Sequence, residues 1–138
     1  MTRIAISGPT DIAVGVLDAI IQDFKAQVRY GDTIFSGAAF GVDTAGARAA
    51  QLAGAKLTLI RPADLWHNDN LTEIADHVIN VYGSYMERND RLALEADRLV
   101  AYPLSAVEQL RSGTWATVRR FRKLGKPVEI RPIDSLEL

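Results

Sequence analysis

Short apolar runs alternate with stretches of helical periodicity along nearly the whole chain, and no other feature of the sequence restricts the fold as strongly. Between the runs, apolar residues recur at spacings of three and four positions, which places them on one face of a helix. Strands joined by helices pair in parallel, because each helix carries the chain back across the sheet. The sequence therefore predicts an α/β fold with a mainly parallel sheet. The expected strands lie at 4–6, 33–35, 56–60, 77–81, 98–102 and 128–130.

Helices are expected from 11 to about 28, at 42–53, at 85–96 and from 114 to about 124. Three of these helices run up to a glycine, namely Gly31, Gly54 and Gly125. Glycine is the usual residue just past a helix C-terminus, because it adopts left-handed backbone angles without strain. The segment 61–84 has the weakest periodicity, and we expect a loop there with a short helix at 71–76.

The chain has the size of a single domain, expected to span residues 1–138. Its 138 residues are 48% hydrophobic, which is enough to bury one core. The formal net charge is −1, so no overall positive field draws the protein to nucleic acid or to an anionic membrane. No apolar stretch approaches the roughly 20 residues of a membrane-spanning helix, and no signal segment opens the chain. We therefore expect a cytoplasmic protein with no membrane partner. The lack of cysteine excludes disulfides and thiolate chemistry.

Three loops rich in glycine, serine and threonine, at 7–10, 36–44 and 112–114, are expected beside helix N-termini. Ligands of parallel sheets bind at the carboxyl ends of the strands. Glycine lets the backbone approach a phosphate, and the free N–H groups of a helix's first turn then donate to it. One such loop is more often a plain tight turn, but three in one short chain favour a shared anion-binding pocket. The ligand-binding candidates in and near these loops are Ser7, Gly8, Ser36, Gly37, Ala38, Gly41, Val42, Asp43, Pro103, Ser112, Gly113 and Thr114.

Two common kinds of nucleotide site are disfavoured. No Walker lysine follows any of the three loops, and their glycine spacing does not fit G-x-G-x-x-G. Asp43 has two interpretations: it caps the helix that begins there, or it accepts a ribose hydroxyl or orders the phosphate loop. We expect no cofactor beyond a nucleotide-like ligand and no metal site, because His67 and His77 lack the spacing of metal ligands.

A second group of polar candidates opens the helix expected at 85–96. Arg88 and Arg91 are three residues apart and could both reach an anion, while Asn89 can donate and accept hydrogen bonds. The alternative is a solvated ion pair between Glu87 and Arg91. All three candidates, Arg88, Asn89 and Arg91, are retained as ligand-binding residues.

The C-terminal part is locally basic. Seven basic residues lie between 111 and 131 against one acid, Glu129, and could contact a nucleic-acid backbone. The commoner explanation is the solvated face of a helix that buries Trp115, Val118 and Phe121. Trp66 could pack over a base, or serve in the core or as a lid.

Several motifs resemble those of known families. SGAAFGVDTA at 36–45 resembles the S-G-G-A-x-G-[IV]-D-T-A stretch of the DNA-processing protein A (DprA/Smf) family. Arg88-Asn89 with the strand at 97–102 is similar to segments of the YspA-like and LOG-like families. SGTW at 112–115 and GKPV at 125–128 resemble their G-G-T helix and G-K-P-V strand. These families belong to the SLOG superfamily, and the motif order covers roughly 3–131.

The resemblance implies a single Rossmann-like, three-layer α/β/α domain that binds a nucleotide or nucleotide-derived ligand, and it implies a homodimer. Two alternatives follow from the same families. The first is a LOG-like N-glycosidase acting on nucleoside monophosphates, although the P-G-G-x-G-T-x-x-E pattern of those enzymes has no glutamate in the matching stretch 111–118. The second is a DprA-like protein that binds single-stranded DNA, with Ala38 in place of the family's second glycine. Nucleotide binding or sensing is the favoured hypothesis, and nucleic acid the less favoured partner.

Overall fold

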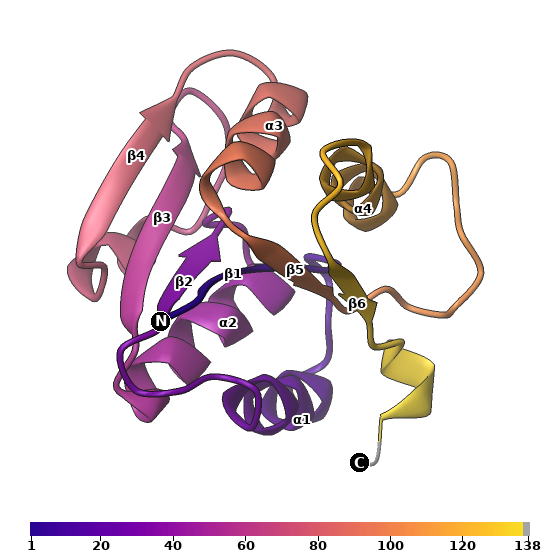
Figure 1. The fold of residues 1–138 in the computed structure, drawn as a ribbon, viewed down its shortest axis with the longest axis horizontal. Helices are drawn as coiled ribbons and strands as arrows, with labels where there is room; N and C mark the ends of the chain where they lie inside the picture. The colour runs from indigo at the N-terminus through magenta and orange to yellow at the C-terminus, as the bar shows by residue number, and fades with distance from the viewer. Residues whose placement is uncertain (137–138) are drawn as a thin grey trace.

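The computed structural model describes residues 1–136 and contains one six-stranded sheet with strand order β4-β3-β2-β1-β5-β6 (Figure 1). All five neighbouring strand pairs are parallel. The strands are β1 (Arg3–Ser7), β2 (Thr33–Ser36), β3 (Lys56–Pro62), β4 (His77–Val81), β5 (Arg98–Ala101) and β6 (Val128–Ile130). The helices are α1 (Val14–Lys25), α2 (Val42–Ala53), α3 (Tyr85–Glu95) and α4 (Gly113–Lys123), with short 3-10 helices η1 (Asp69–Glu73) and η2 (Ile133–Ser135).

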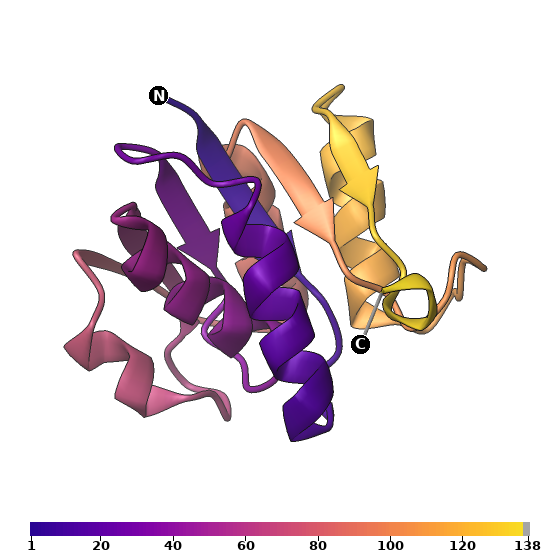
Figure 2. The same cartoon turned by 90° about the horizontal axis from the view of Figure 1, so that it is seen from below.

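Helices cover both faces of the sheet (Figures 1 and 2). Because side chains alternate between the faces of a strand, neighbouring residues of β1 enter different cores. Ile4 and Ile6 pack in the cluster with α1 and α2, whereas Ala5 joins the cluster formed with α3 and α4. The three-layer α/β/α architecture with a parallel sheet is thus confirmed.

The strand order places a topological switch point beside β1. The chain continues from β1 through β2 and β3 to β4 in one direction, then returns to the opposite side of β1 with β5 and β6. At such a point the loops that leave the two central strands diverge, which opens a crevice at their carboxyl ends. Here these loops are the β1–α1 loop and the β5–α4 loop.

Close packing fixes the β1–α1 loop against the start of α2. Gly41 has a φ of 74°, and a Cβ there would lie 2.4 Å from the carbonyl oxygen of Pro9. The amide of Val42 donates to that same oxygen at 3.1 Å. A Cβ on Gly8 would meet the Val42 side chain at 2.5 Å. These glycines therefore allow two loops to touch along their backbones.

The expected boundaries of several elements were wrong. α1 begins at Val14, because Ala13 before it has an extended backbone, and it ends at Lys25. The short helix is a 3-10 turn at Asp69–Glu73, where the Asn68 side chain accepts from the Asn70 amide. The 3-10 helix η2 was not expected. The strands at 77–81 and 128–130 and the helix at 42–53 lie as predicted.

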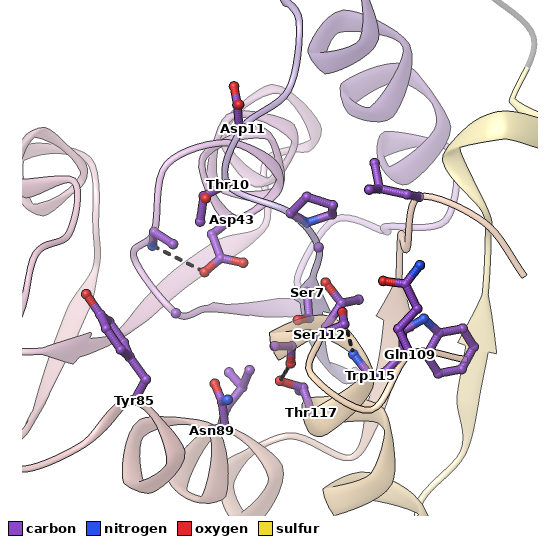
Figure 3. Close-up of a pocket in the computed structure, with 18 of the residues that line it drawn as sticks. Ser7, Thr10, Asp11, Asp43, Tyr85, Asn89, Gln109, Ser112, Trp115 and Thr117 are labelled. Atoms are coloured by element: carbon purple, nitrogen blue, oxygen red, sulfur yellow. Dashed lines mark hydrogen bonds between the residues drawn. The ribbon is translucent and has the colours of Figure 1, made fainter. Parts of the chain in front are cut away.

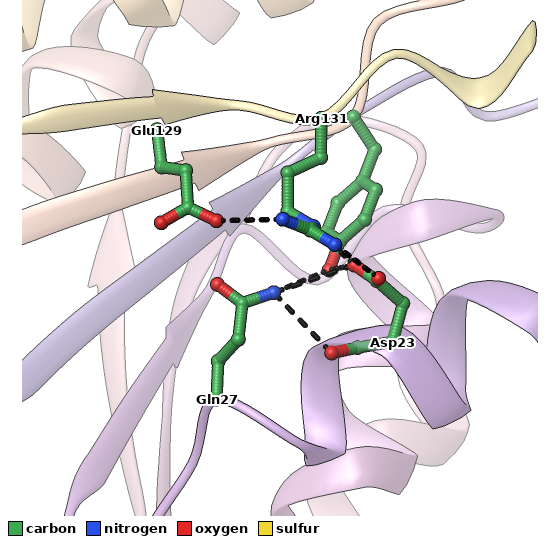
Figure 4. A network of polar contacts seen from close by, with 5 residues as sticks. Asp23, Gln27, Glu129 and Arg131 are labelled. Atoms are coloured by element: carbon green, nitrogen blue, oxygen red, sulfur yellow. Dashed lines mark hydrogen bonds and ion pairs between the residues drawn. The ribbon is translucent and has the colours of Figure 1, made fainter. Parts of the chain in front are cut away.

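A polar network joins the last strand to α1 (Figure 4). Arg131 donates to both carboxylate oxygens of Asp23, at 2.5 and 2.6 Å, and the buried Tyr102 hydroxyl donates to Asp23 at 2.7 Å. Burial alone would raise the pKa of Asp23, but the hydrogen bonds from Arg131 and Tyr102 outweigh it and hold that pKa below its ordinary value. Across residues 1–136, no helix is both long and apolar enough to cross a membrane.

Candidate ligand-binding site

A pocket of about 710 Å³ lies at the switch point, where the carboxyl ends of β1, β2 and β5 meet the first turns of α3 and α4 (Figure 3). It receives residues from every loop that the sequence singled out. The predicted candidates that line it are Ser7, Gly8, Gly37, Asp43, Arg88, Asn89, Ser112, Gly113 and Thr114. Gly37, Arg88 and Gly113 come from three separate parts of the chain, so the expected convergence on one pocket is observed in the geometry.

Three nearly buried polar side chains keep unpaired hydrogen-bonding groups at this pocket. Ser7 and Asn89 are each 9% exposed, and Thr114 is 5% exposed. Within residues 1–136, the hydroxyls of Ser7 and Thr114 and the Asn89 side-chain N–H₂ make no hydrogen bond, while the Asn89 oxygen accepts from Arg88. In the described part of the chain, no side-chain nitrogen or oxygen that is itself buried lacks a partner, so these three free groups are the solvent-facing ends of otherwise buried side chains. All three residues line the same pocket, where these groups can bond to a polar ligand.

The N-terminus of α4 adds backbone donors to the same pocket. The Ser112 hydroxyl caps the helix by accepting a hydrogen bond from the Trp115 amide at 3.3 Å. The amides of Gly113 and Thr114 have no acceptor among the residues that the structure describes. Gly113 is exposed, and a Cβ on it would meet nothing within 4 Å, so a side chain fits there without striking the fold. Two free amides at the positive end of a helix form an anion site.

Arg88 supplies positive charge between α3 and the β2–α2 loop. Its Nη1 donates to the carbonyl of Gly37, and its Nε donates to Asn89 Oδ1 at 2.9 Å. Its guanidinium lies 5.5 Å from the ring centre of Tyr85. No carboxylate of residues 1–136 forms an ion pair with it. The guanidinium is therefore held in place at the pocket, where the nearby carboxyl group that its charge influences is that of Asp43.

Asp43 lies at the bottom of the pocket, in the first turn of α2. Its Oδ2 accepts from the Ala39 amide at 3.2 Å, which orders the β2–α2 loop. Burial raises the pKa of Asp43 to about 6, and the positive charge of Arg88 and the Ala39 hydrogen bond only partly oppose this shift. The loop-ordering interpretation of Asp43 is thus observed, and its carboxyl group also faces the pocket.

Four predicted candidates of the β2–α2 segment support the pocket without lining it. Ser36 is buried, with its hydroxyl donating to the Asp43 carbonyl at 3.0 Å and accepting from the Ala38 amide at 3.3 Å. Ala38 is fully buried at a φ of 63°. Gly41 and Val42 contact the β1–α1 loop, and the Val42 amide is occupied by Pro9.

Arg91 and Pro103 also lie off the pocket. Arg91 forms an ion pair with Glu95 at 2.9 Å, one turn further along α3, rather than with Glu87. Pro103 is buried after β5, and its carbonyl accepts from the Ile133 amide at 2.8 Å. Both residues are bonded to other parts of the protein, and neither lines the pocket.

Sequence reasoning missed several lining residues, above all Tyr85, Gln109 and Thr117. Thr117 had a readable signal, because it lies one helical turn after Gly113 and so shares its face. It also stands where the P-G-G-x-G-T-x-x-E pattern carries its glutamate. Its hydroxyl donates to the Gly113 carbonyl at 3.1 Å. Gln109 lies in a loop without periodicity and had no such signal.

Most of the basic residues near α4 already have partners. Arg119 pairs with Glu108 at 2.9 Å, Arg120 with Asp90 at 3.0 Å, and Arg131 with Asp23. Lys126 donates to three main-chain carbonyls at the end of α3. Four of the seven basic residues between 111 and 131 thus bond to other parts of the protein.

No protein-family model matches the chain, and none of the curated proteins does. Solved structures are similar. The protein TM1055 superposes with a TM-score of 0.70 at 19% identity, over 93% of this chain and 72% of its own. DNA processing protein A (DprA) from Streptococcus pneumoniae superposes with a TM-score of 0.71 at 24% sequence identity, over 94% of this chain. The molybdenum cofactor carrier protein from Chlamydomonas reinhardtii gives 0.69 at 24%, over 94% of this chain and 75% of its own.

The chain spans only 50% of the DprA protein. At 24% identity or less, these likenesses establish the fold. The chain therefore has the Rossmann-like fold of these proteins, as the motifs led us to expect.

Proposed function

We propose that this protein binds or senses a nucleotide or nucleotide-derived ligand in the switch-point pocket. The observation that carries the proposal is the convergence of unpaired polar groups from Ser7, Asn89 and Thr114 with the free amides of α4. The neighbouring Arg88 favours a negatively charged group among them. A pocket of about 710 Å³ is in the usual size range for small-molecule sites, about 300–1,000 Å³.

The parts of the ligand follow from the chemistry of the lining. A phosphate suits the amides of Gly113 and Thr114, with Arg88 as the counter-charge. Hydroxyl groups of a sugar suit the free donors of Ser7 and Asn89. One structural neighbour is named as a carrier of the molybdenum cofactor, which supports a carrier or sensor role for a pocket of this fold.

Calorimetric titration with a panel of nucleotides and ADP-ribose tests the proposal, with Gly113→Val as the disrupting variant. A valine there adds bulk in front of the free amides without striking the fold, since nothing lies within 4 Å of the Cβ position. Gly15→Val is the matched control, because Gly15 is also exposed in the first turn of a helix and equally free of neighbours. We expect millimolar or tighter binding that Gly113→Val abolishes and Gly15→Val keeps. Absence of heat with the whole panel would overturn the proposal.

One observation favours a second candidate, the N-glycosidase. Asp43 faces the pocket with a pKa of about 6, as a general acid near neutral pH requires. In that reaction, water attacks the anomeric carbon, the bond to the base nitrogen breaks, and Asp43 gives its proton to the base and regains one from the water. Chromatography of nucleoside monophosphates after incubation with the protein tests this candidate. Release of free base, lost in Asp43→Asn, would support it, and no release would reject it.

A further inference from the structure

Two aromatic side chains stack at the rim of the pocket, and nothing in the core accounts for them. Trp66, in the loop after β3, and Phe40, in the β2–α2 loop, have ring centres 4.6 Å apart and planes inclined by 27°. Trp66 remains 66% exposed and Phe40 36% exposed. An indole that makes one stacking contact and leaves most of its surface in water contributes little to a core.

The backbone beneath Trp66 is fixed from two sides. The hydroxyl of Tyr85, in the first turn of α3, donates to the Trp66 carbonyl at 2.8 Å. Two residues further on, the Asn68 amide donates to the Ala38 carbonyl in the β2–α2 loop at 2.8 Å, and the Asn68 side chain donates to the Thr44 hydroxyl in α2 at 3.1 Å. These bonds fix the backbone, and the stacking contact on Phe40 holds the indole itself, so less entropy is lost when a ligand binds.

Of the two stacked residues, only Trp66 lines the pocket. Because Phe40 stacks on one face of the indole and Trp66 is still 66% exposed, the other face is open to a second ring. The same pocket is lined by the start of α4, with its free amides, and by Asn89 of α3; Asn89 and Ser112 can be followed in Figure 3.

We propose that Trp66, backed by Phe40, is a stacking platform for a planar heteroaromatic ring, such as a purine base, at the end of the ligand remote from its phosphate. This inference rests on the proposed function, because it divides that one pocket into a ring subsite and a phosphate subsite. Aromatic side chains bind bases by stacking on their π-faces, and because every base has such a face, stacking does not distinguish one base from another.

The test compares two probes, adenosine monophosphate and ribose phosphate, which share the phosphate and sugar and differ in the ring. Calorimetry is run on the wild type, Trp66→Ala, Trp66→Phe and Tyr82→Ala. Tyr82 is the matched control, because it is an aromatic residue of nearly equal exposure, 65%, that does not line the pocket. We expect Trp66→Ala to weaken adenosine monophosphate binding by between about 5-fold and 100-fold. Ribose phosphate binding is expected to stay unchanged, and Trp66→Phe to recover most of the loss.

The outcomes separate the two proposals. If the wild type binds both probes and Trp66→Ala leaves both affinities unchanged, or lowers both equally, the platform is overturned while the pocket's phosphate site stands. An equal loss in Tyr82→Ala would also overturn it. If the wild type binds neither probe, nor any nucleotide of the wider panel, the proposed function falls and the platform falls with it.

Discussion

Arg88 on α3 donates a hydrogen bond from Nη1 to the main-chain carbonyl of Gly37 in the β2–α2 loop, 51 residues away in sequence. This contact joins α3 to the loop that the Asp43 carboxyl group orders through the Ala39 amide. A Cβ on Gly37 would lie 2.7 Å from the same Nη1, so a side chain there would displace the guanidinium from this position. The guanidinium thus has both a structural role and, under our proposal, a ligand-binding one.

Replacing Arg88 by alanine is expected to weaken nucleotide binding and to lower the free energy of unfolding by about 1.5–3 kcal/mol, the usual effect of losing a hydrogen bond to a charged group. Urea denaturation and calorimetry measure the two effects. Arg91→Ala is the matched control, because Arg91 lies one turn further along α3 in an exposed pair with Glu95. It should cost less than about 1 kcal/mol and leave binding intact. If both substitutions changed the free energy of unfolding and the nucleotide affinity equally, Arg88 would have neither the structural nor the ligand-binding role assigned to it.

The raised pKa of Asp43 predicts a pH dependence of stability with a defined sign. Between its ordinary value of 3.8 and its folded value of about 6, the folded protein keeps a proton that the unfolded chain has lost. This group therefore favours the folded state less and less as pH rises through that window.

Asp43→Asn carries no titrating proton, so its free energy of unfolding should rise relative to the wild type by about 2–3 kcal/mol between pH 4 and pH 6 and stay level above pH 7. Denaturation curves of both proteins across this range provide the comparison. Subtracting the free energy of unfolding of the wild type from that of the variant cancels the contribution of the other carboxylates. Asp23 is one of them, and its lowered pKa makes the folded state more stable as pH rises. A difference that is flat with pH would refute the burial argument.

The sequence was sufficient to predict the sheet, the helices and the meeting of Gly37, Arg88 and Gly113, because those depend on periodicity and on which strand ends carry glycine. It was insufficient inside the loops. Whether Val42 offers its amide to a ligand depends on the backbone path of the β1–α1 loop, which places the Pro9 carbonyl in front of it. The sequence likewise places a glutamate four residues to either side of Arg91, Glu87 and Glu95, and only the side-chain geometry shows that Arg91 pairs with Glu95.

The network around Asp23 gives a prediction that is independent of the ligand site. Tyr102→Phe removes the hydroxyl that donates to Asp23 at 2.7 Å from a fully buried position. We expect a loss of about 1–2 kcal/mol in the free energy of unfolding, measured by urea denaturation at neutral pH. Tyr30→Phe is a suitable control, since Tyr30 is 87% exposed and its hydroxyl has no hydrogen bond within residues 1–136. A similar loss in both variants would show that the buried network is not the source.

The contact between the first two loops can be tested apart from the chemistry of the pocket by substituting Gly41. Gly41→Ala would force a side chain into a φ of 74° and ψ of −127°, with its Cβ 2.4 Å from the Pro9 carbonyl. Gly125→Ala is the matched control, because its φ of 71° is similar but nothing lies within 4 Å of its Cβ position. We expect Gly125→Ala to cost about 1–2 kcal/mol for the left-handed backbone alone, and Gly41→Ala to cost at least about 2 kcal/mol more, since neither backbone can yield without separating the loops. Thermal and urea unfolding measure both. If the two alanine variants proved equally stable, the β1–α1 and β2–α2 loops would have to be freer to move apart than their packing indicates, and the preformed pocket between them would lose its physical basis.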